Sequence, residues 1–396
     1  MREAGLSEVG IVADESGEVR NLVGLLPGST PREIILSAHF DSVADSPGAG
    51  DDASGCGVVI AAAADLTRTP LAHGVRVVLF DREEDRLAGS RSWLSTLEPG
   101  ERDRILADLN VEMVGWGGSA GAVVHLFGVE RRGSRVVPPA WLAHAVLEAG
   151  RAIGWPLSAA DPRISVLGQL VVRTTELRHY ADSDALLAEG IPAILLSDSS
   201  LTAFDPAYHT PADGRDRLDR QRLERWTDLV AASVRRLDGL KGRPRDDDRY
   251  LVVGGRVLHR RVLYWIGFAV WVALVFRGLP GRWRRRAGGE RRRAGRRYLP
   301  GYVTRMLFLV SLLVAPVLSV ALLLPAALAA LGRWRSARAR WMAQSVTLLP
   351  VFLYLLVLGV ATGRGFVRSV EIGALSLALV ASSLAAFSWA LWHRPE

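Results

Sequence analysis

Two histidines and several carboxylates in the first 240 residues follow short apolar runs, and side chains of these types can bind a metal ion. A mixed set of imidazole nitrogens and carboxylate oxygens suits zinc or a similar divalent metal. The single cysteine, Cys56, excludes a disulfide framework and a cysteine-based zinc site. The candidate residues are His39, Asp41, Asp51, Asp52, Glu83, Glu84, Glu112 and His209.

The spacing of these residues suggests separate roles for some of them. Two metal ions need more than four ligands, and a shared carboxylate, for which Asp51 is the natural candidate, can hold both. A metal-bound imidazole commonly donates its second N–H to a carboxylate, and Asp41 lies two residues from His39 on the same side of an extended strand. In the pair Glu83-Glu84, one residue can bind metal while its neighbour acts as a general base.

Compact runs rich in valine, isoleucine and leucine alternate with helical stretches in the same part of the chain. Runs typical of strands buried on both faces lie at 33–40, 74–80, 106–114 and 191–197. Small and apolar residues at helical spacing occupy 55–68 and 138–154. This alternation predicts an α/β fold with a mostly parallel (mixed) central sheet sandwiched by helices. The candidate residues follow the predicted strands, so we expect them to converge at the carboxyl ends, where such sheets bind ligands.

Several motifs, in order, resemble those of the di-zinc peptidases of clan MH, which include bacterial leucyl aminopeptidases, glutamate carboxypeptidases and glutaminyl cyclases. The resemblance covers roughly residues 20–225, most of a catalytic domain. It implies a zinc-peptidase fold of the phosphorylase/hydrolase-like type. The matching stretches are NLVGLLPG, AHFDSV, GAGDDASG, LFDREEDRLAGSRSWL, NVEMVG, GIPAILLS and YHTPAD.

The resemblance implies two Zn²⁺ per chain, held by five ligands. Asp51 would bridge the two ions, His39 and Glu112 would complete one of them, and Glu84 and His209 would complete the other. The Asp51–Asp52 bond falls where the family often has a cis peptide that is not followed by proline.

The resemblance also implies the catalytic residues. Glu83 would deprotonate the bridging water and later pass the proton to the leaving amine, and Asp41 would support His39. Tyr208 resembles a tyrosine that binds substrate by donating a hydrogen bond to the oxyanion. Asp184 matches an aspartate of the stretch that shapes the substrate pocket.

Three departures from the family pattern affect what the resemblance implies. Glu112 replaces an aspartate that many members carry, and the glutamate form also occurs outside the aminopeptidases. The usual Ser-Asp-His stretch reads DSDALL, so Ala185 replaces the histidine and the substrate specificity stays open. The N-terminal helix of the family domain is expected to be mostly missing.

Charge and hydropathy divide the chain into two parts. Residues 1–240 hold 24 basic and 35 acidic side chains, whereas 241–396 hold 25 and 6, so the basic pI belongs to the second part alone. We expect a peptidase domain over 1–240, a linker over 241–261 and a transmembrane region over 262–396. The three to four predicted spans lie at about 262–279, 306–331, 342–363 and 372–392.

Eleven arginines in 277–305 favour a cytoplasmic loop between two spans over a nucleic-acid site. If 262–276 crosses the membrane, the peptidase domain then lies on the extracytoplasmic side. The chain is thus expected to be a multi-pass protein of the cell membrane, with lipid and peptides as partners and no nucleic acid. Four arginines in 333–341 lie in a loop that this topology places outside, so they argue against it.

An anchored zinc aminopeptidase is the function that these features favour. A carboxypeptidase or a glutaminyl cyclase of the same fold is an alternative, although a cyclase uses one zinc and should not need all five ligands. A catalytically inactive membrane receptor or scaffold is a second alternative, which the intact Glu83 and ligand set disfavour. A transporter is disfavoured because the spans contain no internal acid or lysine.

Overall fold

A mixed eight-stranded sheet forms the centre of the computed structural model, which describes residues 1–118, 121–132, 134–159, 169, 180–200, 204–245, 250–259 and 262. The strand order is β1-β2-β4-β3-β5-β10-β6-β9. The inner strands β4, β3, β5 and β10 are parallel, and their neighbours β2 and β6 are antiparallel to them. The bounds are β1 (Ser7–Ala13), β2 (Arg20–Leu26), β3 (Glu33–His39), β4 (Gly74–Phe80), β5 (Ile105–Glu112), β6 (Val123–His125), β9 (Ser158–Ala159) and β10 (Ala193–Ser197).

The four predicted strands coincide with the four parallel ones, so the predicted mixed sheet is confirmed. Long crossovers join these strands, as parallel pairing requires, and the crossovers contain most of the helices. Shorter elements complete the described chain. They are η1 (Arg2–Ala4), η2 (Ala49–Ala53), η3 (Arg215–Arg217), α3 (Pro99–Arg104) and the hairpin of β7 (Val129–Arg131) and β8 (Ser134–Val136).

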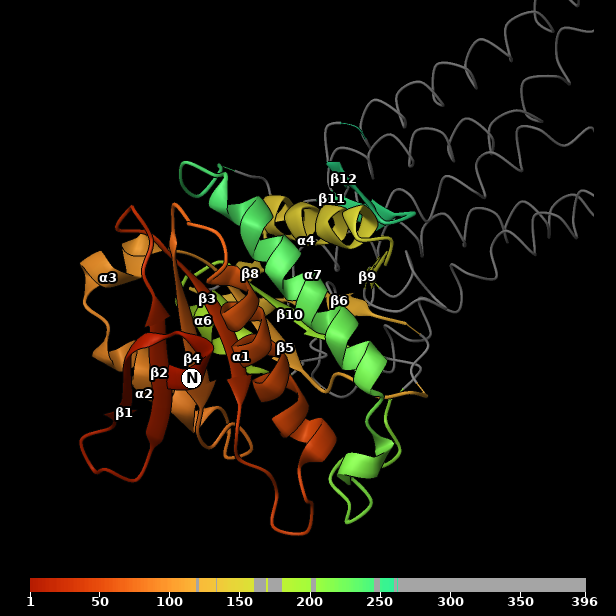
Figure 1. Cartoon of the computed structure of the whole chain (residues 1–396). Coiled ribbons are helices and arrows are strands. Elements are labelled where there is room, and N and C mark those ends of the chain that lie inside the picture. The colour runs from red at the N-terminus through yellow and green to blue at the C-terminus, as the bar shows by residue number, and fades with distance from the viewer. Residues whose placement is uncertain are drawn as a thin grey trace, which may run out of the picture. The chain divides into compact units, whose positions relative to one another are not determined.

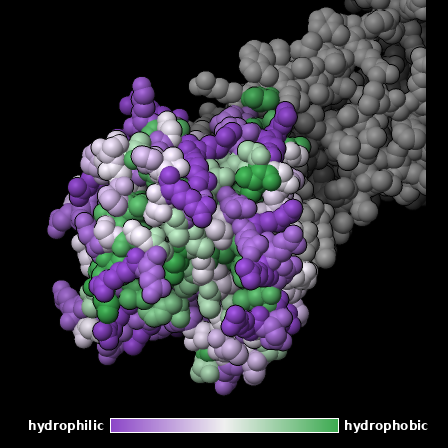
Figure 2. All heavy atoms as spheres, in the orientation of Figure 1, coloured by the Kyte–Doolittle hydropathy of each residue, from purple (hydrophilic) through white to green (hydrophobic). Residues whose placement is uncertain are grey.

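Helices cover both faces of the sheet (Figure 1). One face packs against α1 (Ser54–Leu66), α4 (Ala140–Ala152) and α7 (Arg220–Asp238), which share a single apolar core with the strands. The other face packs against α2 (Ala88–Thr96) and α6 (Asp182–Ala188) through a second, smaller core. The outward sides of the helices nearest the viewer are rich in hydrophilic residues (Figure 2).

The two faces of the central strands differ in polarity. Successive side chains of a strand point to opposite faces, and in β3 and β5 one set is apolar and packs on the larger core. The other set becomes polar toward the carboxyl ends of the strands. Its polar members are Ser37 and His39 in β3 and Asp108, Asn110 and Glu112 in β5, all buried. The candidate ligands His39 and Glu112 therefore end two polar rows at the same edge of the sheet.

Part of the predicted linker belongs to the folded core. Residues 241–261 were expected to be a linker, but β11 (Tyr250–Val253) and β12 (Arg256–His259) form a hairpin within them. The side chains of Tyr250, Leu251 and Val252 are buried, and the Tyr250 hydroxyl donates to the carbonyl of Pro138 at 2.7 Å. The first three residues of the apolar sequence YLVV pack into the core, so the linker prediction is wrong for these residues.

The predicted transmembrane region lies outside the described residues, apart from Val262. Within the described ranges, no helix has both the length and the apolar character needed to cross a bilayer. The predicted spans between 262 and 392 therefore stay predictions from composition.

Two glycines of α1 allow a direct test of how closely this helix packs on the sheet. A side chain at Gly55 would collide with the Val111 carbonyl and the Asp52 carboxylate, whereas Gly57 is exposed with open space around it. We expect Gly55→Ala to destabilise the fold by at least ~1–3 kcal/mol through overpacking. Gly57→Ala should instead stabilise it by about 0.4–1 kcal/mol. Urea unfolding of both variants measures the difference, and equal effects would contradict the packing described.

Candidate active site

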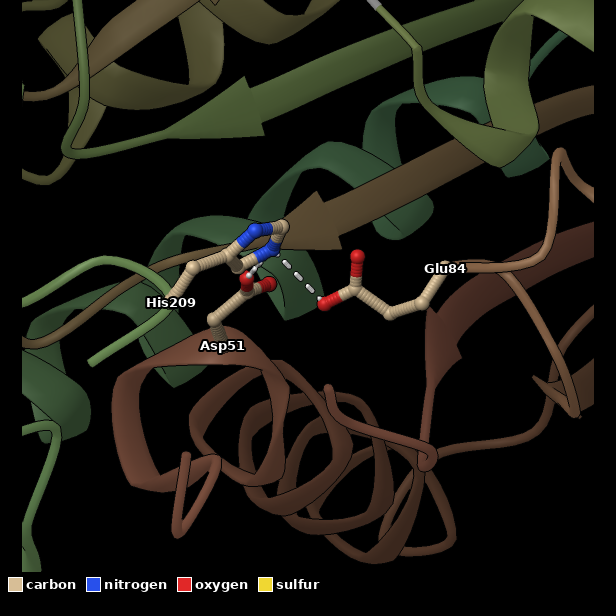
Figure 3. A group of neighbouring side chains, drawn as sticks. All are labelled: Asp51, Glu84 and His209. Carbon is tan, nitrogen blue, oxygen red and sulfur yellow. Dashed lines mark hydrogen bonds and ion pairs between the residues drawn. The ribbon is translucent and has the colours of Figure 1, made fainter. Parts of the chain in front are cut away.

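The predicted ligands converge at the carboxyl ends of the parallel strands. His39 and Glu112 are the last residues of β3 and β5, and Glu84 follows β4. Asp51 lies in η2, directly before α1, and His209 lies in the loop that leads to α7. Asp51, Glu84 and His209 point toward one another from these three separate segments (Figure 3).

Asp51 occupies the centre of the cluster, because its two carboxylate oxygens face different histidines. Its Oδ1 lies 3.1 Å from His39 Nε2, and its Oδ2 lies 3.3 Å from His209 Nε2. The same nitrogen of His209 lies 2.9 Å from Glu84 Oε1. The ligand atoms of Asp51, Glu84 and His209 all lie within 4.8 Å of one another, as expected of groups that share a cation.

The residues present fit a divalent metal. Glu112 is buried, and its Oε1 has no hydrogen-bond partner among the described residues; the same holds for Asp51 Oδ2. Buried carboxylate oxygens without partners are costly, and a cation would satisfy them. Two imidazoles and three carboxylates are also the donor types that zinc prefers.

The crowding of the acidic groups also indicates a site for a divalent metal. Burial, with the neighbouring carboxylates Asp182 and Glu84, raises the pKa of Glu83 to about 9. Burial also raises the pKa of Glu112, with Glu83 adding to the effect. Burial lowers the pKa of His39, but its bonds to Asp41 and Asp51 outweigh this and raise the pKa well above the usual value. A bound divalent cation opposes the protonation of neighbouring carboxylates.

Asp41 connects two parts of the site. Its Oδ1 lies 3.4 Å from His39 Nδ1, on the side of the ring away from Asp51. Its carboxylate also accepts hydrogen bonds from the backbone N–H groups of Glu83 (3.0 Å) and Glu84 (3.2 Å). The aspartate predicted to support one histidine therefore also fixes the backbone of both glutamates.

Asp52 makes a similar connection, which the sequence did not indicate. The peptide bond between Asp51 and Asp52 is cis, as the resemblance implied. The buried Asp52 carboxylate accepts from the backbone N–H groups of His39 (3.4 Å), Gly55 (2.9 Å) and Met113 (3.1 Å). It thereby joins the ends of β3 and β5 to the start of α1. No spacing rule predicts these bonds, since they depend on where the loops lie.

Tyr208 lies at the exposed side of the cluster. Its ring stacks on the imidazole of His209, with the ring centres 3.6 Å apart, and it contacts the ring of Phe204 edge-on. Burial, together with the charges of Asp51 and the glutamates, raises the pKa of its hydroxyl, which therefore keeps its proton as a hydrogen-bond donor.

The two aspartates of the DSDALL stretch have different surroundings. Asp184 lines a cavity of about 390 Å³ between α2 and α6, and its predicted role in substrate binding stays a prediction. Asp182 is fully buried, and its charge acts on Glu83 and Glu112. Asp182 was missed because the sequence alone does not show which of two acids two residues apart faces inward. Ala185 is buried in the smaller core.

Comparison with known proteins places this arrangement among peptidases. The model of Peptidase family M28 matches residues 21–234. Aminopeptidase YwaD of Bacillus subtilis is 26% identical over 220 residues, which cover 54% of this chain and 44% of that protein. Endoplasmic reticulum metallopeptidase 1 of Mus musculus is 29% identical over 230 residues, which cover 55% of this chain and 22% of that protein.

A solved structure, that of a zinc aminopeptidase from Bacillus subtilis, matches with 26% identity and a TM-score of 0.45, over 54% of this chain and 49% of that one. The chain spans less than half of the length of the two curated relatives named above. The family match extends from β2 into α7 and includes every predicted metal ligand. This chain therefore belongs to peptidase family M28.

Proposed function

We propose that this chain is a zinc-dependent aminopeptidase, which removes N-terminal residues from peptides. The observation that carries the proposal is the placement of Asp51, whose two carboxylate oxygens face the Nε2 atoms of His39 and His209. Glu83, the residue in the family's catalytic position, is buried beside this cluster. The name of the Bacillus subtilis relative, an aminopeptidase, supports an aminopeptidase rather than another peptidase.

Two zinc ions are proposed to occupy the cluster. His39 and Glu112 would hold one, Glu84 and His209 the other, and Asp51 both. Zinc bound in such a site polarises the scissile carbonyl and lowers the pKa of a water molecule. The bonds from backbone N–H groups to Asp41 and Asp52 hold the backbone of the segments that carry Glu84 and His39.

Glu83 is proposed to act as the general base and then as the general acid. Its backbone N–H is held by Asp41, and its carboxyl group is largely withdrawn from solvent. From this position it would accept a proton from the attacking water and deliver it to the nitrogen of the leaving amine. Tyr208 would donate its hydroxyl proton in a hydrogen bond to the oxygen of the scissile carbonyl as negative charge develops there.

We also propose that residues 262–396 anchor the peptidase domain in the cell membrane, with the domain on the extracytoplasmic side. The support is compositional. Three uncharged apolar runs after residue 305 each have the length of a span, and the arginine-rich 277–305 is typical of a cytoplasmic loop. Reporter fusions at residue 290 and at the C-terminus test the topology. A cytoplasmic signal at 290 is expected, and an external one would contradict it.

The substrate class can be tested on the zinc-loaded, full-length protein. Aminoacyl p-nitroanilides should be hydrolysed, and the same compounds with an acetylated α-amine should not. Chelator should abolish the activity and added zinc should restore it. Release of C-terminal residues would instead identify a carboxypeptidase, and cyclisation of N-terminal glutamine would identify a glutaminyl cyclase. Inactivity of folded, zinc-loaded protein on all of these substrates would favour the scaffold.

The adjacent glutamates provide a matched pair of variants, because the proposal gives them different roles. Glu83→Gln should lower kcat by a factor of about 10²–10⁴, the usual effect of losing a general base, while zinc affinity stays near that of the wild type. Glu84→Gln should weaken zinc binding. Metal content and thermal unfolding with and without zinc measure binding separately from turnover. Loss of zinc from Glu83→Gln, or unchanged zinc affinity in Glu84→Gln, would contradict these roles.

A further inference from the structure

Asp213 lies four residues after His209 and contacts the segment that carries Asp51. The backbone N–H of Gly50 donates to its Oδ1 at 2.7 Å, and the N–H of Asp51 donates to its Oδ2 at 3.1 Å. The N–H of Ala49 donates to the backbone carbonyl of Asp213 at 3.2 Å. Three consecutive N–H groups of η2 are thus bound by a single buried residue.

The local sequence permits this close approach on both sides. A Cβ atom at position 50 would lie 2.7 Å from Asp213 Oδ1, which is too close, so any larger residue there would push the Asp213 carboxylate away. On the other side, the N–H of Asp213 donates to the carbonyl of Thr210, which closes a tight turn directly after His209. This turn therefore holds the Asp213 carboxylate at a short, fixed distance from the backbone of His209.

We propose that Asp213 is a positioning residue of the metal centre, a proposal that rests on the function given above. Asp51 and His209 must reach the same ion although they are 158 residues apart in sequence. Asp213 joins their two backbones and so sets the distance between Asp51 Oδ2 and His209 Nε2. Partners that orient metal ligands in this way commonly contribute 10–100-fold to metal affinity or activity.

A second aspartate makes the same kind of contact with a segment that carries no proposed metal ligand. Asp238, the last residue of α7, accepts from the consecutive N–H groups of Ala72 (3.0 Å) and His73 (2.6 Å). Both carboxylates thus bind two successive amides more than 160 residues away. Asp238 is therefore a matched control for the stability that such a contact contributes.

The test compares Asp213→Asn with Asp238→Asn in the full-length protein. In each variant an amide NH₂ replaces one acceptor oxygen and opposes a backbone N–H, so both should lose thermal stability in the metal-free form. Zinc affinity, measured by competition with a chelator, should fall by a factor of about 10–100 in Asp213→Asn alone. Equal zinc affinities of the two variants would show that Asp213 is only structural and would overturn the proposal.

Gly50→Ala tests the same contact from the opposite side if Asp213→Asn does not fold. The added methyl group displaces the Asp213 carboxylate, so zinc affinity should fall as in Asp213→Asn, and wild-type affinity would overturn the inference. Zinc binding and hydrolysis by the wild-type protein distinguish the proposed function from the proposed role of Asp213. Wild-type protein that binds no zinc overturns the proposed function and this inference together, whereas normal zinc binding and hydrolysis with unaffected variants overturns the inference alone.

Discussion

Hydrogen bonds from backbone N–H groups to aspartate carboxylates hold the proposed metal centre together. Its ligands come from distant segments of the chain, and a sheet edge alone brings such segments near one another without fixing them to within an ångström. Asp41 binds the amides of Glu83 and Glu84, and Asp52 binds those of His39 and Met113. Each of these carboxylates belongs to one ligand-bearing segment and holds the backbone of another, so the segments constrain one another.

Such a site is costly to the fold when no cation is present. Glu83, Glu112 and Asp52 are buried near one another, and burial raises the pKa of all three. Arrangements of this kind persist only where the surrounding structure stabilises them. Here the larger core joins α1, α4 and α7 to the sheet, while the polar row of β5 faces the smaller one. The apolar packing on one face of the sheet thus offsets the cost of the crowded carboxylates on the other face.

The sequence was sufficient to predict the parallel strands and the residues that gather at their ends. Val, Ile and Leu runs of strand length are a strong signal, and a metal site uses few residue types, so a group of candidate ligands could be predicted. The resemblance to the peptidase family then implied which five of them, His39, Asp51, Glu84, Glu112 and His209, would bind metal. The bonds of Asp52 could not be, because they depend on loop geometry rather than on spacing. The charge interaction of Asp182 with the site and the core packing of Tyr250, Leu251 and Val252 were missed for a related reason: both depend on which side of a short segment faces inward.

The division of the two Asp51 oxygens between two histidines has a thermodynamic consequence. If a metal ion occupies the half of the site that contains His39, it changes the charge and the orientation of the same carboxylate that serves the half containing His209. In the proposed two-ion site the two occupancies would therefore be linked. By reciprocity, whatever factor the first ion imposes on the affinity of the second, the second imposes on the first. Metal loading of the proposed two-ion site would then be a property of the pair, described by one coupling free energy in addition to two separate dissociation constants.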